Sequence, residues 1–260
     1  MHKRTGCDGC RNGEAFPISF TMAFHPIVDV AAGDIWGYEA LVRGTEGQGA
    51  GAVLGQVTEE NRYVFDQACR VKAIELAGTK MPRGSKARLS INFMPNAVYE
   101  PSACIRSSLA AAARVKFDPR RLMFEFTENE QMADTAHVER IVSEYKRMGF
   151  ITALDDFGAG FAGLGLLAKF QPDLIKIDME LIRGIASSPA RQGIVGGIMH
   201  MAKALGITVI AEGIETEAEL LTLRAAGVSL FQGYIFAKPQ IETFAAEVDL
   251  PYLSGLRATA

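Results

Sequence analysis

Apolar residues fall into two kinds of segment that alternate along the chain: short β-branched or aromatic runs, and longer stretches with helical spacing. The short runs each predict a strand and cover residues 20–30, 35–42, 88–94, 121–126, 150–155, 174–177, 208–211 and 229–231. The longer stretches each predict a helix and cover residues 60–78, 101–114, 136–148, 163–170, 190–205 and 217–226. Such alternation is typical of parallel strands with crossover helices, and eight strands favour a closed α/β barrel over an open sheet.

The first two strands depart from this alternation. A Gly33-Asp34 turn separates them, which predicts a hairpin. Residues 44–55, which follow the hairpin, carry five glycines and are interpreted as a loop. A phosphate-binding role for these glycines would need a helix opening directly on them, and the next predicted helix begins only near Glu59.

Length and composition favour one large domain. A single α/β barrel needs about 250 residues, and the chain has 260, of which 48% are hydrophobic, with a formal net charge of -3. We expect a flexible leader over residues 1–18 and a single barrel domain over 19–260. No long basic run marks a surface for DNA or RNA. No apolar stretch approaches the ~20 residues that span a bilayer, and no signal peptide is evident, so a cytoplasmic protein without membrane attachment is expected.

The four cysteines are too few for a disulfide scaffold in a chain of this length. Cys69 and Cys104 lie in helical patterns, where a free thiol commonly packs as a small hydrophobe. Cys7 and Cys10 form a CxxC pair in the glycine-rich leader, which is compatible with half of a zinc site, a redox pair or a flexible tail. The tail is favoured because His2 is the only further ligand close by.

Polar residues stand where the predicted strands end, and parallel strands of a barrel deliver these ends to one face. The residues are Glu39, Asn92, Glu125, Asp155, Asp156, Lys176, Glu212 and Gln232. A single carboxylate at such a position is as compatible with a helix N-cap as with a ligand. Five carboxylates at one mouth would repel one another strongly unless positive charge lay between them. The pattern therefore predicts a bound cation.

The ligand types narrow the choice of metal. Carboxylate and amide oxygens without His or Cys suit hard ions such as Mg²⁺ or Mn²⁺. The neighbours Asp155 and Asp156 would allow one carboxylate to bridge two ions roughly 3.5–4 Å apart, the arrangement used to cleave phosphodiesters. In this mouth Lys176 would neutralise charge, orient an attacking water or form a plain salt bridge.

Several motifs, in order over residues 20–240, resemble those of EAL-domain cyclic di-GMP phosphodiesterases. They are Tyr38-Glu39-Ala40-Leu41-Val42-Arg43, Ser90-Ile91-Asn92, Phe124-Glu125-Phe126-Thr127-Glu128, Asp155-Asp156-Phe157-Gly158-Ala159-Gly160, Lys176-Ile177-Asp178, Ala211-Glu212-Gly213-Ile214-Glu215-Thr216, and Gln232-Gly233-Tyr234 with Pro239. The resemblance implies an atypical TIM (β/α)8 barrel in which one early strand runs antiparallel.

The resemblance also implies roles for individual residues. The metal ligands would be Glu39, Asn92, Glu125, Asp155, Asp156 and Glu212, and the catalytic residues Lys176, Glu212, Glu39 and Asp155. Substrate would be bound by Arg43, Leu41, Gln232 and His25, and the loops of the site would be stabilised by Glu128 and Glu215. The implied cofactor is Mg²⁺ or Mn²⁺ as two ions. The implied partners are cyclic di-GMP and a second copy of the chain, which would bind through the loop and helix after Asp156.

Two positions depart from the pattern of the family. His25 stands where the family often has Gln, so we expect either altered substrate affinity or pH response with retained chemistry, or a packed His without a role. After Gly160, Phe161-Ala162-Gly163 replaces the common Tyr-Ser-Ser and removes hydroxyls from the loop without touching an expected ligand.

The leading function is therefore metal-dependent hydrolysis of cyclic di-GMP to the linear dinucleotide pGpG. One alternative is a catalytically weak cyclic di-GMP receptor or protein-interaction module, as some members of this family are. Such members usually have gaps in the acidic set, and none is visible here. Another alternative is a barrel enzyme for a different phosphodiester or a phosphorylated sugar, which would not need the Glu39-to-Arg43 spacing.

Overall fold

A computed structural model describes residues 18–127, 135–160 and 163–245 of the chain. Its strands are β1 (Phe20–Asp29), β2 (Asp34–Gly44), β3 (Arg88–Asn92), β4 (Leu122–Thr127), β5 (Ile151–Phe157), β6 (Leu174–Ile177), β7 (Thr208–Ala211), β8 (Leu230–Phe231) and β9 (Gln240–Ile241). Its α-helices are α1 (Ala50–Leu54), α2 (Arg62–Lys80), α3 (Pro101–Cys104), α4 (Arg106–Val115), α5 (Thr135–Arg147), α6 (Gly163–Leu167), α7 (Met179–Ile182), α8 (Pro189–Leu205) and α9 (Glu217–Ala225).

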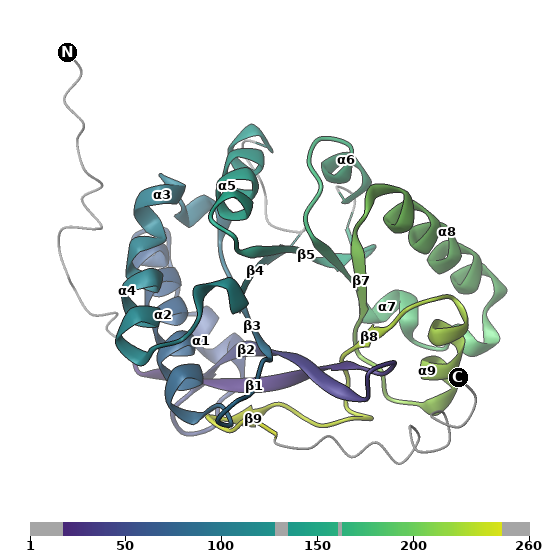
Figure 1. Ribbon diagram of the computed structural model, residues 1–260, viewed down its shortest axis with the longest axis horizontal. Helices are drawn as coiled ribbons and strands as arrows, with labels where there is room; N and C mark the ends of the chain where they lie inside the picture. The colour runs from purple at the N-terminus through teal and green to yellow at the C-terminus, as the bar shows by residue number, and fades with distance from the viewer. Residues whose placement is uncertain (1–17, 128–134, 161–162, 246–260) are drawn as a thin grey trace.

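The first eight strands close into a barrel with helices around its outside (Figure 1). Strands β2 to β8 pair in parallel in the order of the sequence. Strand β1 closes the ring, because it pairs antiparallel with β2 on one side and with β8 on the other. This confirms the expectation of a modified TIM barrel in which one early strand runs antiparallel.

The interior of the barrel is filled at one end by a separate apolar cluster. Six strands each contribute one residue to it: Ile27, Met123, Ala153, Leu174, Ile210 and Leu230. Their positions lie towards the N-terminal ends of the parallel strands, and Trp36 packs against them from β2. Burying each large side chain stabilises the fold by about 1.5–3 kcal/mol. The apolar end leaves the opposite end, where the parallel strands finish, for the polar residues.

Several short elements differ from the sequence-based expectation, among them α7, which no pattern predicted. Residues 44–55, interpreted as a loop, contain α1, whose Val53 is buried against the core. The helix expected over 101–114 divides into α3 and α4 at Ile105. Strand β9 was not expected, because two residues that pair with Ala23 and Phe24 of β1 carry no periodicity of their own.

Two further features concern the surroundings of the barrel. The expected thiols Cys69 and Cys104 are free and buried. Among the described residues, no helix combines the length and the apolar character needed to cross a membrane. The leader with Cys7 and Cys10, the residue Glu128 and the Phe161-Ala162 pair lie outside the described residues.

Candidate metal and substrate site

The polar strand ends meet at the C-terminal mouth of the barrel. The register explains this, because neighbouring parallel strands pair Asn92 of β3 with Glu125 of β4 and bring the other ends to the same level. The structure thus brings together Glu39, Asn92, Glu125, Asp155, Asp156, Lys176, Glu212 and Gln232. Glu39 was expected at a strand end but lies in the middle of β2, which continues to Gly44.

Lys176 lies at the centre of the carboxylates and is only 1% exposed. Its Nζ is 2.6 Å from Glu212, 3.2 Å from Asp155, 3.3 Å from Glu125 and 3.4 Å from Glu39. Burial lowers the pKa of Lys176, but the four carboxylates outweigh burial and raise it well above its ordinary value. Lys176 is therefore a cation built into the site.

The carboxylates around Lys176 differ in protonation. Burial raises the pKa of Glu39, but Lys176 and hydrogen bonds from Gln232 and Asn92 together lower it to about 2. Glu125 and Glu212 behave in the opposite way, since burial and the neighbouring carboxylates outweigh Lys176 and raise the pKa of each well above its ordinary value. Without a metal ion the site therefore retains protons on some of its carboxyl groups.

Two amide side chains hold Glu39 in place. Asn92 Nδ2 donates to Glu39 Oε1 at 3.0 Å and lies 3.2 Å from Glu125 Oε1. Gln232 Nε2 donates to Glu39 Oε2 at 2.9 Å. Both oxygens of the Glu39 carboxylate are thus held by hydrogen bonds. Because Asn92 donates through Nδ2, its amide oxygen stays available as a metal ligand.

The donor set fits a divalent cation. Two groups of carboxylates each have oxygens within 4.8 Å of one another: Glu39, Glu125 and Asp155, and Asp155, Asp156 and Glu212. Asp155 belongs to both groups. The buried Glu125 Oε2 has Lys176 Nζ at 3.3 Å as its ion-pair partner but accepts no well-formed hydrogen bond from a described residue, so it keeps acceptor capacity for a further cation. An all-oxygen set of this kind suits a hard ion.

Asp156 has an unusual backbone conformation, with φ at 53°. Its amide donates to Asp155 Oδ1 at 2.9 Å. Burial, the charge of Asp155 and the charge of Asp178 raise the pKa of Asp156 to about 6. A left-handed aspartate costs free energy and is concentrated at functional sites, which is a signal that the sequence does not reveal.

A cleft of about 370 Å³ opens above these carboxylates. All four residues expected to bind substrate line it: His25, Leu41, Arg43 and Gln232. The Nε2 of His25 lies 3.0 Å from the carbonyl of Ala237, which fits donation from an Nε2–H. Burial lowers the pKa of His25 despite the nearby charge of Glu39, so the ring is neutral at pH 7. His25 is therefore a polar wall of the cleft with its orientation fixed.

Sequence reasoning missed part of the rim. Met179, Arg183, Tyr234 and Pro239 line the same cleft, and both Met179 and Tyr234 are about half exposed. Tyr234 and Pro239 belong to a motif shared with the family, but no pattern marked Met179 and Arg183, which lie in and directly after the four-residue helix α7. Exposed apolar surface beside a polar cleft is suited to the faces of planar bases.

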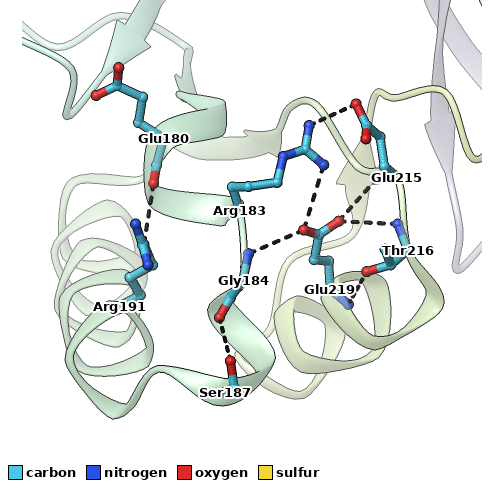
Figure 2. Close-up of polar contacts among 8 residues, drawn as sticks. All are labelled: Glu180, Arg183, Gly184, Ser187, Arg191, Glu215, Thr216 and Glu219. Carbon is cyan, nitrogen blue, oxygen red and sulfur yellow. Dashed lines mark hydrogen bonds and ion pairs between the residues drawn. The ribbon is translucent and has the colours of Figure 1, made fainter.

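Arg183 joins the loop after β6 to the loop after β7 (Figure 2). Its Nη2 donates to Glu215 Oε1 at 2.8 Å, and its Nη1 lies 3.6 Å from Glu219 Oε1. Glu219 also accepts hydrogen bonds from the backbone amides of Gly184, Glu215 and Thr216. The Thr216 hydroxyl in turn accepts from the Glu219 amide, which completes a capping box at the start of α9. The Thr-x-x-Glu spacing was the sequence signal for this network.

Comparison with known proteins identifies the family. The EAL domain model matches residues 18–239. The chain belongs to the EAL domain family. Among solved EAL proteins, a standalone versatile EAL protein from Vibrio cholerae O395 with c-di-GMP bound is 50% identical; the match covers 92% of this chain and 98% of that protein with a TM-score of 0.86.

Other relatives carry an EAL domain within longer chains. BlrP1 of Klebsiella pneumoniae, solved as a calcium/cy-diGMP complex, is 33% identical over 90% of this chain and 58% of its own, with a TM-score of 0.82. The blue light- and temperature-regulated antirepressor BluF of Escherichia coli is 37% identical over 85% of this chain and 54% of its own. The cyclic di-GMP phosphodiesterase PA2567 of Pseudomonas aeruginosa is 30% identical over 85% of this chain and 38% of its own. The EAL domain described here thus spans about half or less of these two curated relatives.

Proposed function

We propose that this EAL domain hydrolyses cyclic di-GMP to the linear dinucleotide pGpG and depends on a divalent cation. The observation that carries the proposal is the unbroken set of oxygen ligands around Lys176, at the base of a cleft that also contains Arg43. Relatives named as cyclic di-GMP phosphodiesterases and EAL structures with c-di-GMP support the choice of substrate.

The residues that would hold metal are Glu39, Asn92, Glu125, Asp155, Asp156 and Glu212, with Asp155 shared between two positions. Mg²⁺ or Mn²⁺ bound there would stabilise charge on the phosphoryl oxygens and lower the pKa of water. Two ions are proposed because the carboxylates divide into two groups that share Asp155.

The side chains of the chain itself bind and orient the substrate. Arg43 offers a planar fork of donors to a phosphate, and Leu41 presents an apolar wall to a base. His25 is held by the contact of its Nε2 with the Ala237 carbonyl, so it presents a neutral imidazole of fixed orientation to the cleft. Gln232 contributes to substrate binding by holding Glu39 in position, because its Nε2 donates to the Glu39 carboxylate.

Hydrolysis forms a bond from a water oxygen to phosphorus and breaks the bond from phosphorus to the 3′ oxygen. Lys176 stays protonated and orients the water, while the carboxylate of Glu212, 2.6 Å from Lys176 Nζ, accepts the proton that the water releases. The proton is then delivered to the leaving 3′ oxygen, so the site returns to its starting state.

The test is chromatography of the nucleotides after incubation with cyclic di-GMP and Mg²⁺ or Mn²⁺, with and without EDTA. We expect metal-dependent formation of the linear dinucleotide, and a loss of about 100-fold or more in Glu39→Gln, because a ligand is neutralised. Glu59→Gln is the matched control, because the Glu59 side chain is 94% exposed and does not line the cleft. Full turnover by Glu39→Gln would refute the proposal.

A second candidate function is a receptor or protein-interaction module, and the similarity to the antirepressor BluF favours it specifically. This candidate predicts binding of cyclic di-GMP without turnover in the same assay. Isothermal titration with Ca²⁺ in place of Mg²⁺ measures binding separately from hydrolysis.

We also propose that the domain forms a homodimer through the loop and helix after Asp156. Leu164 of α6 supports this, because it is an apolar side chain with 68% of its surface exposed. Leu164→Glu should shift the mass in analytical ultracentrifugation from dimer to monomer, whereas Leu221→Glu on α9 should leave it unchanged.

A further inference from the structure

A second groove lies at the end of the barrel opposite to the carboxylates. It has a volume of about 510 Å³ and runs between the β1–β2 turn and the loop that leads from α2 into β3. One wall contains Asp29 and Asp34, and the other contains Arg83, Lys86 and Arg88. Trp36, at the start of β2, lines it as well. None of these residues belongs to the catalytic cleft.

Arg88 is held in a fixed position in this groove. Its guanidinium carbon lies 4.4 Å from the centre of the Trp36 ring. The two residues lie on adjacent parallel strands, where Arg88 pairs with Gly37. Because Trp36 also packs against the apolar cluster inside the barrel, the stacked pair rests on the core. The guanidinium is thus presented by rigid elements at little cost in side-chain entropy.

The cations of the groove form no ion pair with a described carboxylate, although Asp29 and Asp34 line the opposite wall. Among residues 18–127, 135–160 and 163–245, no carboxylate lies within 4 Å of the charged nitrogens of Arg83, Lys86 or Arg88. Burial lowers the pKa of Arg88. Burial also lowers the pKa of the neighbouring Arg121, and the positive charge of Arg88 lowers it further. A guanidinium that is partly removed from water without an anion carries an unrecovered desolvation cost.

The acidic wall does not supply the missing anion. Asp29 Oδ1 accepts hydrogen bonds from the amides of Ala31 and Ala32, and Asp34 Oδ1 accepts one from the amide of Ile35. These bonds hold both carboxylates to their own turn. The carboxylates of the acidic wall therefore accept hydrogen bonds from their own turn, whereas the cations of the basic wall have no described carboxylate as a partner.

The backbone of the basic wall also offers donors. Residues Pro82 to Ser85 form a turn in which the Ser85 amide donates to the Pro82 carbonyl at 3.1 Å, and Gly84 has a φ of 81°. The amides of Gly84 and Lys86 have no hydrogen-bond partner in the part of the chain that the structure describes. These two amides, on either side of the bonded Ser85 amide, are left to donate to a ligand.

We propose that this groove is a binding site for a small ligand that carries phosphate groups, with Arg83, Lys86 and Arg88 as its contacts. The guanidinium fork matches phosphate oxygens, and the volume lies within the range of small-molecule sites. Inorganic pyrophosphate and a nucleoside triphosphate share this chemistry. The site stands apart from the catalytic cleft and is independent of the function proposed above.

The test uses the fluorescence of Trp36, which is the only tryptophan in the chain. The intact protein is titrated with pyrophosphate and with GTP in the presence of EDTA, and NaCl of equal ionic strength serves as the salt control. We expect a saturable change for at least one phosphate ligand and none for NaCl, because an anion that engages Arg88 alters its stacking on the indole. Response to both ligands indicates recognition of phosphate alone, and response to GTP only indicates a nucleotide.

Variants separate this site from binding elsewhere. Arg83→Gln/Lys86→Gln should weaken the affinity about tenfold or more, and both side chains are exposed, so the fold should persist. Lys203→Gln, an exposed cation on α8, is the matched control and should leave the affinity unchanged. Equilibrium dialysis with radiolabelled pyrophosphate gives a second readout that does not depend on fluorescence. Equal affinity in the double variant, an equal response to NaCl, or no retention of either ligand would overturn the proposal.

Discussion

At the scale of single residues, the site is governed by how its carboxyl groups share charge with Lys176. Four carboxylates lie within 3.4 Å of its nitrogen, and three of them divide into Glu39 with a lowered pKa and Glu125 and Glu212 with raised values. Lys176 and the hydrogen bonds from Gln232 and Asn92 lower the pKa of Glu39, whereas burial and the neighbouring carboxylates prevail at Glu125 and Glu212. Two predictions belong to this scale.

The first prediction concerns Asp156, whose pKa rises from 3.8 to about 6 on folding. A carboxyl with a raised pKa destabilises the folded state as the pH rises from about 4 to 6, and the cost persists above that window. Asp156→Asn should therefore raise the free energy of unfolding of the metal-free protein by about 1–2 kcal/mol at pH 8, after allowance for partial exposure, and by nearly zero at pH 4. Asn also tolerates the left-handed backbone at this position. Urea unfolding at both pH values in EDTA is the measurement, and equal changes at the two would contradict it.

The second prediction concerns Lys176→Met. Removal of the cation leaves buried carboxylates without a counter-charge, so the metal-free variant should lose about 3–5 kcal/mol at pH 8. The loss should shrink at pH 5, where these carboxyls take up protons more readily. Thermal unfolding in EDTA tests this, with Lys146→Met as the control, because Lys146 forms an ion pair with Asp173 in which both side chains are more than a third exposed. A loss independent of pH would indicate packing alone.

Sequence reasoning reached the strand-end residues but not their protonation. Glu39, Asn92 and Lys176 could be placed because parallel strands bring their C-terminal ends to one face. The backbone of Asp156 and the hydrogen bond from His25 to Ala237 could not, since both depend on loops from distant parts of the chain. The assigned roles of these residues in metal and substrate binding remain predictions.

At the scale of elements, the loops after β6 and β7 act as one unit because of Glu219. The buried carboxylate of Glu219 joins Gly184 after α7 to Glu215 and Thr216 before α9. It thereby fixes the backbone that follows Glu212, one of the proposed metal ligands. The long helices were predictable from their apolar periodicity, whereas this link could be anticipated only as a local helix cap.

Glu219→Ala should lose about 1–3 kcal/mol of stability, because three backbone amides and Arg183 lose their acceptor. Glu219→Gln retains one acceptor oxygen for the amides and should lose less. Urea unfolding of the two variants gives the comparison. If Glu219→Gln were as destabilised as Glu219→Ala, the negative charge next to Arg183 would matter more than the backbone hydrogen bonds.

At the scale of the whole molecule, the barrel separates two ends of different character. The apolar cluster and the groove around Trp36 occupy one end, and the carboxylates occupy the other. The architecture was predictable because eight strand patterns alternate with helices. Strand β9 and helix α1 were not, because so few residues carry no usable period.

Metal binding should stabilise the whole molecule in a manner that depends on pH. A ligand that binds only the folded state adds about 2.7 kcal/mol at a concentration 100 times its Kd. The ligands must be ionised, so this gain is present above the raised pKa of about 6 for Asp156 and is lost as the pH falls through it. Differential scanning calorimetry with MnCl₂ or EDTA should therefore show a larger shift of Tm at pH 8 than at pH 5. Glu39→Gln should reduce the shift at pH 8, and a shift that grew towards low pH would be inconsistent with carboxylate ligands.

The buried Lys176 has a consequence for the evolution of such domains. Because the cation at the centre of the mouth is part of the chain, the barrel does not depend on a captured ion to hold its carboxylates together. If a related domain lost one acidic ligand, and with it the chemistry, Lys176 would still pair with the remaining carboxylates. The lysine thus separates the charge balance of the barrel from the occupancy of its metal site.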